Sequence, residues 1–246
     1  MKKCYLGIDA GSYSIKVVII DSKKNIICSS YVYNNNVLSI KKILCGLYKK
    51  IDVNKYKIVG VGVTGSYRKI IGLLLETNII KNEIVCHGVG GNYFYRDIDT
   101  IIDVGKNNIK IININNNRII DYSINNIDMD DMDEIEKFFR DKCFKKVSIQ
   151  GGNSNNIINT IKKYANYIYI NDVSYLMGAI GVALIVLNSG IEKDYNIKIE
   201  DIRYNVKEKN CRMCNNKCNV VCMYKNNKIV NYRGSKCYKK INELKF

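Results

Sequence analysis

Apolar residues in the first third of the chain alternate or run together in short blocks separated by turn residues. This pattern predicts antiparallel strands joined by tight loops, over residues 3–9, 15–21 and 25–33. Apolar positions then recur at helical spacing over 37–50, and a short apolar block predicts a strand at 57–63. The Thr64-Gly65-Ser66 turn leads from that strand into a helical stretch.

The same order of elements begins again near residue 99. Strands are predicted near 99–104, 108–114 and 117–123. Helices and strands then alternate: a helix near 129–142, a strand at 146–150, a helix at 153–165, a strand at 166–170 and a helix at 173–187. The repetition predicts a duplicated, two-lobed α/β fold with a cleft between its halves.

These patterns divide the chain into four parts. We expect a first lobe over 1–95 and a second lobe over 96–189. Residues 190–210 are rich in Lys, Asp, Glu and Asn with weak periodicity, which is typical of a connector. A small cysteine-rich module over 211–246 completes the chain.

A nine-residue pattern, Ile-Asp-x-Gly-x-x-x-Ile-Lys, occurs at 8–16 and again at 102–110. A strand that ends in Asp and turns through Gly forms a hairpin whose tip presents backbone N–H groups and one carboxylate. Carboxylates suit Mg²⁺, and glycine lets the main chain approach phosphate oxygens. One copy alone is more typical of an ordinary hairpin, but two copies favour nucleotide chemistry centred on Asp9 and Asp103.

The bulk composition is that of a globular chain long enough to bury a core, with 246 residues, 47% hydrophobic and 25% charged. The formal net charge of +16 comes from lysines scattered along the chain rather than from one block. Such a field favours anionic ligands such as nucleotides or coenzyme A esters. We do not expect nucleic acid as the partner.

No apolar segment reaches the roughly 20 residues that span a bilayer. The longest candidate, Tyr175–Leu187, has 13 residues and includes two glycines. Asp9 and Lys16 also interrupt any signal-peptide core near the start. We therefore expect no membrane association and a cytoplasmic location.

Five of the ten cysteines lie in the last 36 residues: Cys211, Cys214, Cys218, Cys222 and Cys237. In a reducing compartment this clustering indicates a metal or redox site rather than structural disulfides. Thiolates of Cys211, Cys214 and Cys218 can converge on one metal from a single loop, with the distant Cys237 completing the shell. A structural zinc site, an iron–sulfur site and free thiols all stay open, and Cys222 is either an extra ligand or a core residue.

Four landmarks follow one another in a fixed order: the Asp9 hairpin, the Asp103 hairpin, Gly151-Gly152 after a strand, and the glycine-containing helix around Met177–Gly181. This order resembles the actin, sugar kinase and Hsp70 type of ATPase fold, which is ribonuclease H-like. More narrowly, the chain resembles the BadF/BadG/BcrA/BcrD ATPase family, which includes activators of 2-hydroxyacyl-CoA dehydratases. The resemblance covers about residues 4–187 and rests on Leu6–Ser12 with Lys16, Gly62–Arg68, Asn82–Ile84 with Cys86 and His87, Ile101–Gly105, Gly151-Gly152 with Asn156, and Leu176–Gly181.

The resemblance implies an ATP-driven electron donor, in which a homodimer with a bridging [4Fe-4S] cluster passes a low-potential electron to a dehydratase-like partner. It implies that Asp9 and Asp103 position Mg²⁺ and the attacking water, with Glu83 as a third catalytic candidate. Glu83 as a plain solvent-facing helix carboxylate stays open, and His87 is more typical of a packed histidine. The residues implied in binding ATP or ADP are Gly11, Ser12, Lys16, Gly105 and Lys106 at the phosphates and Gly151, Gly152 and Asn156 near the adenosine.

Several features depart from the family pattern. The family's Cys-Ala-Ala-Gly-Thr-Gly-like segment is missing, because the run from Asn125 to Glu136 is acidic and contains no cysteine. Cys143 is the sole thiol before Gly151 in this part, and we expect it to be a buried apolar residue. Lys106 stands where the family has a second glycine, so it either holds a phosphate or fills the space that the γ-phosphate needs.

The C-terminal cysteines are a second candidate for the cluster site that the missing segment would have supplied. Their spacing resembles a cysteine module found after the ATPase domains of larger family members, and Arg233–Cys237 fits the last cysteine of that module. Three functions follow. The first is an ATP-hydrolysing activator whose redox centre lies in these cysteines. The others are a catalytically weak nucleotide-binding regulatory subunit with a structural zinc site, and a small-metabolite kinase.

Overall fold

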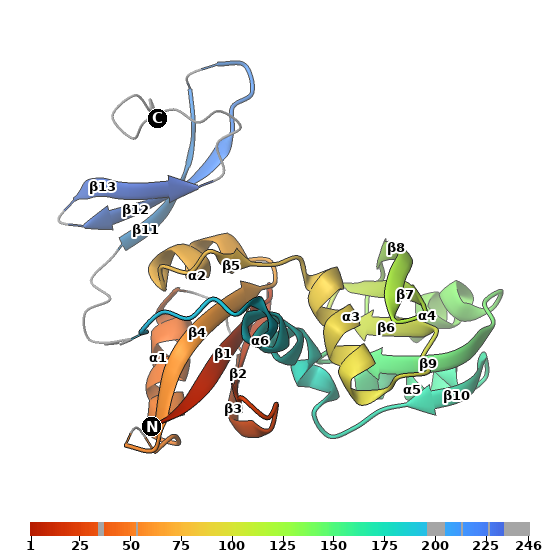
Figure 1. Cartoon of the computed structure of the whole chain (residues 1–246). Coiled ribbons are helices and arrows are strands. Elements are labelled where there is room, and N and C mark those ends of the chain that lie inside the picture. The colour runs from red at the N-terminus through yellow and green to blue at the C-terminus, as the bar shows by residue number, and fades with distance from the viewer. Residues whose placement is uncertain (34–36, 53, 196–204, 213, 226, 234–246) are drawn as a thin grey trace.

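The computed structural model describes residues 1–246 apart from 34–36, 53, 196–204, 213, 226 and 234–246. In the described part, two similar α/β lobes lie side by side and a small antiparallel sheet lies near the first lobe (Figure 1). No helix of the described part is long and apolar enough to cross a membrane.

The first lobe is a five-stranded sheet in the order β3-β2-β1-β4-β5. Strands β1, β2 and β3 are antiparallel, and β4 and β5 join β1 in parallel. Helices α1 and α2 cover one face through a core that includes Leu6, Leu44 and Ile71. The elements are β1 (Lys2–Ala10), β2 (Ser14–Asp21), β3 (Ile26–Tyr33), α1 (Val37–Tyr48), β4 (Tyr56–Thr64), α2 (Arg68–Leu74) and β5 (Ile79–Ile80).

The second lobe repeats this topology, with the order β10-β9-β6-β7-β8. Each strand has the position and direction of its counterpart in the first sheet. The elements are β6 (Thr100–Val104), β7 (Asn108–Asn115), β8 (Arg118–Asn126), α4 (Met132–Phe139), β9 (Phe144–Gln150), α5 (Ser154–Ile161) and β10 (Ala165–Tyr169). The duplicated two-lobed α/β architecture predicted from the apolar pattern is confirmed.

Two further helices connect the lobes, and each covers the sheet of the other one. Helix α3 (Glu83–Phe94), which follows the first sheet in sequence, packs on the second sheet through Ile84. Helix α6 (Met177–Ser189), preceded by the single 3₁₀ turn η1 (Ser174–Leu176), packs on β1 and β4 of the first sheet. Nine of the 13 residues of α6 are buried, which explains why the helix is apolar on most of its sides.

Helices α3 and α6 cross closely because each has a glycine at the contact. A Cβ on Gly90 would lie 2.6 Å from the carbonyl oxygen of Met177, and a Cβ on Gly181 would overlap the carbonyl oxygen of Cys86. No larger side chain fits between these two backbones. The lobes are therefore joined through a backbone-to-backbone helix contact.

The sequence pattern did not indicate α3. Its glycines, Gly88, Gly90 and Gly91, lower helix propensity and blur the apolar period. The helix predicted over 129–142 is shorter, because Asp131 caps it by accepting a hydrogen bond from the Glu134 N–H at 2.9 Å. The helix predicted over 173–187 begins as the η1 turn and ends at Gly190, whose φ of 66° suits a helix C-terminus.

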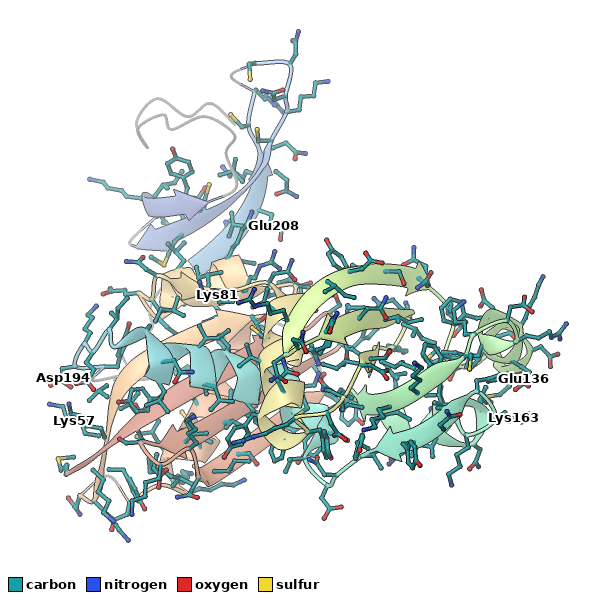
Figure 2. All side chains as sticks on the ribbon, turned by 45° about the vertical axis from the view of Figure 1, so that its right-hand side comes forward. Lys57, Lys81, Glu136, Lys163, Asp194 and Glu208 are labelled. Carbon is teal, nitrogen blue, oxygen red and sulfur yellow. The ribbon has the colours of Figure 1, made fainter. Side chains whose placement is uncertain are left out.

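The chain after α6 runs along the first lobe before it forms the third sheet. The N–H groups of Lys193 and Tyr195 donate to the carbonyls of Val59 and Ile58 in β4. Figure 2 labels the surface ion pair that Lys57 forms with Asp194 at 2.8 Å, and a second pair, Glu136 with Lys163 at 3.1 Å, at the far end of the other lobe. Such exposed pairs contribute little to stability.

The third sheet has the order β11-β12-β13, formed by β11 (Asn205–Asn210), β12 (Asn219–Lys225) and β13 (Lys228–Arg233). It lies beside α2, and Met223 joins the core of the first lobe. Strand β11 falls within the stretch predicted as a connector. Its charged residues hide its strand character, which pairing with β12 reveals.

The helix crossing gives a direct stability test with a matched control. Replacing Gly181 by Ala should lower the free energy of unfolding by at least about 1–3 kcal/mol, because the Cβ meets backbone. Replacing Gly46 in α1 by Ala should raise the free energy of unfolding by about 0.4–1 kcal/mol, because a Cβ there has no atom within 4 Å. Urea unfolding of both variants measures the difference, and equal effects would contradict the close crossing.

Candidate functional site

A cleft of about 820 Å³ lies between the lobes at the carboxyl ends of the central strands. Both Ile-Asp-x-Gly hairpins, the start of α3 and the start of α5 contribute to its walls. The structure brings together nearly all residues predicted for a nucleotide site, since the cleft is lined by Asp9, Gly11, Ser12, Lys16, Glu83, Asp103, Gly105, Lys106, Gly152 and Asn156. Gly151 is buried directly behind this wall.

Each repeat places its Asp directly opposite its Lys across the hairpin. Asp9 pairs in register with Lys16, and the Lys16 ammonium donates to Asp9 Oδ2 at 3.3 Å. In the second lobe Asp103 pairs with Lys110, which donates to Asp103 Oδ2 at 2.7 Å. The seven-residue spacing from Asp to Lys that both repeats share therefore places the two residues as a cross-strand ion pair.

Neighbouring charges shift the pKa values of both members of the second pair. Burial by itself favours the neutral acid, but the charges of His87 and Lys110 hold the pKa of Asp103 well below its usual range. Burial likewise opposes the charged form of Lys110, whereas Asp103 and Glu83 raise the pKa of Lys110 above its ordinary value. Both groups are thus charged throughout the neutral range. The Glu83 carboxylate lies 3.6 Å from the Lys110 ammonium and keeps more exposure than either aspartate.

A buried polar chain supports Asp103 from α3 and β9. His87 Nε2 lies 3.5 Å from Asp103 Oδ2, and His87 Nδ1 lies 2.7 Å from Gln150 Oε1. The Gln150 amide nitrogen donates in turn to Ser148 Oγ at 3.2 Å. His87 is thus a packed histidine with partners on both ring nitrogens. The sequence pattern did not single out Gln150, although it directly precedes Gly151.

In each lobe the glycine that directly follows the neighbouring parallel strand packs its main chain against the carboxylate. Gly65, with φ of +87°, would place a Cβ 2.6 Å from Asp9 Oδ1, and Gly151, with φ of +98°, would place one 2.7 Å from Asp103 Oδ1. Side chains are strained in this backbone conformation and have no room here. Gly151 therefore packs against Asp103, and it is Gly152 that faces the cleft.

The hairpin tips differ from the simple phosphate cradle expected for Gly11 and Gly105. The N–H groups of these two glycines close their own turns by donating to the carbonyls of Ser14 and Asn108, both at 2.9 Å. Within the described residues the N–H groups of Ser12 and Lys106 have no hydrogen-bond partner. The donors available to a phosphate thus lie one residue further along each tip.

The two tips touch each other across the cleft, which the sequence pattern did not reveal. Asn107 Nδ2 donates to Tyr13 Oη at 2.8 Å, and the Lys106 ammonium lies 4.7 Å from the centre of the Tyr13 ring. Tyr13 and Asn107 occupy the same position of the two repeats. Because the two residues are equivalent in the repeat, aligning the two copies would have indicated that they could meet where the tips face each other.

The donor chemistry of the cleft fits Mg²⁺. Asp9 and Asp103 supply carboxylate oxygens, and Asn108 Oδ1 is a buried acceptor in the cleft wall with no hydrogen-bond partner among the described residues. Hard oxygen donors that leave room for water ligands are typical of magnesium sites.

The C-terminal cysteines lie away from this cleft. Cys211 and Cys218 face each other at the base of the β11–β12 loop, where the Cys211 N–H donates to the Cys218 carbonyl at 2.8 Å, and Cys214 is exposed within the loop. Cys222 is buried in β12 as a core residue. Across the described ranges no three His, Cys, Asp or Glu side chains converge as metal ligands, and Cys237 lies outside those ranges. The metal module stays a prediction.

Cys143 differs from expectation. The sequence predicted a buried apolar residue, but Cys143 is exposed in the turn between α4 and β9. The acidic stretch before it forms the short helix α4, which follows β8 after a brief loop. The thiol therefore lies at the outer surface of the second lobe rather than in its core.

Comparison with known proteins agrees with this geometry. A family model described as the BadF/BadG/BcrA/BcrD ATPase family matches residues 6–132. The (R)-2-hydroxyglutaryl-CoA dehydratase activating ATPase of Acidaminococcus fermentans is 25% identical over 125 residues, which are 49% of this chain and 46% of that protein. The chain thus aligns with about half the length of this relative.

Two solved structures share the fold. The activator of the 2-hydroxyisocaproyl-CoA dehydratase from Clostridium difficile with bound ADPNP superposes with a TM-score of 0.61 and 19% identity, covering 76% of this chain and 95% of that one. A ROK family glucokinase from Streptomyces griseus gives a TM-score of 0.54 and 9% identity, covering 75% and 99%. The two lobes therefore have the actin-like fold of ATPases and sugar kinases, as predicted.

The Asp103–Lys110 pair predicts a pH-dependent stability. Because the pKa of Asp103 in the folded protein is below its ordinary value of 3.8, ionised Asp103 stabilises the fold above that pH, and the contribution is lost as the pH falls through the folded-state pKa. Lys110→Met leaves this carboxylate buried without its 2.7 Å ammonium partner and with His87 at 3.5 Å beside it. It should lower the free energy of unfolding by about 3–5 kcal/mol at neutral pH, and by progressively less towards about pH 3.

Urea unfolding across this pH range measures the effect. The control is Lys146→Met, which breaks the exposed 2.8 Å pair with Asp97 and should cost less than about 1 kcal/mol. A loss in Lys110→Met that matched the control, or that grew on acidification, would contradict the assignment.

Proposed function

Because this chain belongs to the BadF/BadG/BcrA/BcrD ATPase family, we propose that it binds ATP with Mg²⁺ in the cleft and hydrolyses it to activate a partner similar to a 2-hydroxyacyl-CoA dehydratase. The observation that carries the proposal is the pair of buried Asp–Lys hairpins that face one cleft. Dehydratase activators among the relatives support the kind of partner.

Hydrolysis of a phosphoanhydride needs positioning and charge neutralisation more than covalent chemistry. Asp9 and Asp103 would hold Mg²⁺, and bound Mg²⁺ neutralises charge on the phosphates. Lys110 keeps Asp103 ionised, so that Asp103 acts as a ligand rather than as an acid, and Lys16 contacts Asp9 at 3.3 Å. The tips of the two hairpins, with the N–H groups of Ser12 and Lys106, face the phosphates.

Glu83 is the carboxylate proposed to orient the attacking water. It begins α3, where Asn82 caps the helix by accepting from the Ile84 N–H at 2.9 Å, so its position is well defined. Unlike the aspartates it is partly exposed to the cleft, and its one ion pair with a residue that the structure describes is the 3.6 Å contact with Lys110. Gly152 and Asn156 on the second lobe are proposed to border the adenosine.

A second candidate function is a nucleotide-binding regulatory subunit. It is favoured by one observation: β8 leads through a short loop into α4, in a stretch that contains no cysteine to hold the family's bridging cluster. Under this alternative ATP binds without appreciable turnover. The measured rate of ATP hydrolysis separates the two functions.

The turnover test uses the full chain with Mg²⁺. Asp9→Asn and Asp103→Asn should each lower kcat for ATP hydrolysis by at least about a hundredfold, because each removes a carboxylate proposed to hold the Mg²⁺ that neutralises charge on the transferring phosphoryl group. Asp97→Asn, which removes an exposed carboxylate outside the cleft, should retain the rate. Binding of ATP without turnover by the unaltered protein would favour the regulatory subunit.

We further propose that the C-terminal cysteines hold a metal centre, either zinc or an iron–sulfur cluster, completed by Cys237. Support comes from the loop between β11 and β12, which places Cys211 and Cys218 opposite each other with Cys214 between them. In the described part the three thiols do not form a complete ligand set, so we derive no electron-transfer step through this centre. A homodimer is likewise a proposal by analogy with the family.

Metal content tests this part. Anaerobically purified protein should contain stoichiometric zinc, or iron with sulfide, and Cys214→Ser should lose most of it because it removes one of the proposed thiolate ligands. Cys143→Ser, which removes an equally exposed thiol of the second lobe, should keep the metal. Protein free of zinc and iron would refute the metal centre and leave the nucleotide site untouched.

A further inference from the structure

Three lysines line the cleft, and two of them are neutralised by carboxylates. Lys16 is paired with Asp9, and Lys110 is paired with Asp103 and lies near Glu83. Among the ion pairs of the described residues, Lys106 has no acidic partner. It is therefore the cleft lysine whose charge is not already compensated by the protein.

The position of Lys106 is set by the opposite hairpin. Its ammonium lies 4.7 Å from the centre of the Tyr13 ring, and the Tyr13 hydroxyl accepts a hydrogen bond from Asn107 at 2.8 Å. Lys106 and Asn107 belong to the second lobe, whereas Tyr13 belongs to the first. The contact thus holds a free cation at the junction of the two phosphate-facing tips.

We propose that Lys106 is the residue by which this cleft distinguishes nucleoside triphosphates from diphosphates. When a triphosphate binds, the ammonium leaves the Tyr13 ring and binds the terminal phosphate. An exposed cation–π contact is weak, whereas an ammonium–phosphate hydrogen bond is charge-assisted and stronger, so the exchange is favourable. The inference rests on the proposed ATP binding.

The rest of the cleft cannot supply this discrimination as readily. Lys16 and Lys110 are held by their aspartates, and the unpartnered N–H groups of Ser12 and Lys106 carry no net charge. The terminal phosphate adds negative charge that these protein groups do not offset, beyond what the proposed Mg²⁺ neutralises. A long, exposed lysine at the second tip can follow the phosphate without any backbone change.

Binding to the full chain tests the proposal without turnover. With Mg²⁺ present, Lys106→Met should weaken binding of ADPNP by about 10–100-fold while ADP binding changes less than about threefold. Lys106→Arg should retain most of the preference, because it keeps the charge. Lys142→Met is the matched control, since the Lys142 ammonium lies over the Phe138 ring at 4.1 Å outside the cleft, and it should leave both affinities unchanged.

Each other outcome overturns the inference. An equal loss for ADPNP and ADP would make Lys106 a general phosphate ligand. Tighter ADPNP binding in Lys106→Met would show that the lysine fills the space of the terminal phosphate. Unaltered protein that binds neither nucleotide would overturn the proposed function together with this inference, and unaltered protein that binds both equally would overturn the inference alone.

Discussion

The buried Asp–Lys pairs are the constraint on which the site depends. A carboxylate with almost no exposure survives in a protein only if a cation and hydrogen bonds replace its water, and the cross-strand lysine supplies the cation in both lobes. The pairs also explain the main-chain approach of Gly65 and Gly151, which excludes side chains from the second carboxylate oxygen. The geometry of the strand ends thus follows from keeping two carboxylates buried beside their lysines.

The duplication gives both lobes the same strand order and the same Asp–Lys hairpin, but the residues around the two aspartates differ. Asp103 has His87 and Gln150 behind it, whereas Asp9 has Lys16 alone as a charged partner within 4.0 Å in the described part. The first tip presents Ser12 and the second presents Lys106. A ligand in the cleft therefore meets two similar carboxylates supported by different neighbours.

The exchange of helices links the two lobes mechanically. Helix α6 buries its apolar surface on the first sheet and α3 buries Ile84 on the second, and the two cross with glycine against backbone. His87 lies on α3 and Gly178 of α6 approaches Asp9, so the crossing and the carboxylates share one region. Any change in the angle between the lobes must move these helices and therefore the site. The third sheet, attached beside α2, lies outside this region.

The sequence by itself determined the duplicated fold and most of the cleft wall. The apolar periods of 2 and 3.6 mark the strands and most helices, and the seven-residue spacing from Asp9 to Lys16 and from Asp103 to Lys110 is enough to build both hairpins. Only the tertiary structure decided the role of α3, whose glycines hide its periodicity, and the contacts of His87 with Gln150 and of Tyr13 with Asn107. The physical reason is that periodicity reports local geometry, whereas these contacts join residues far apart in sequence that meet because two packed lobes bring them together.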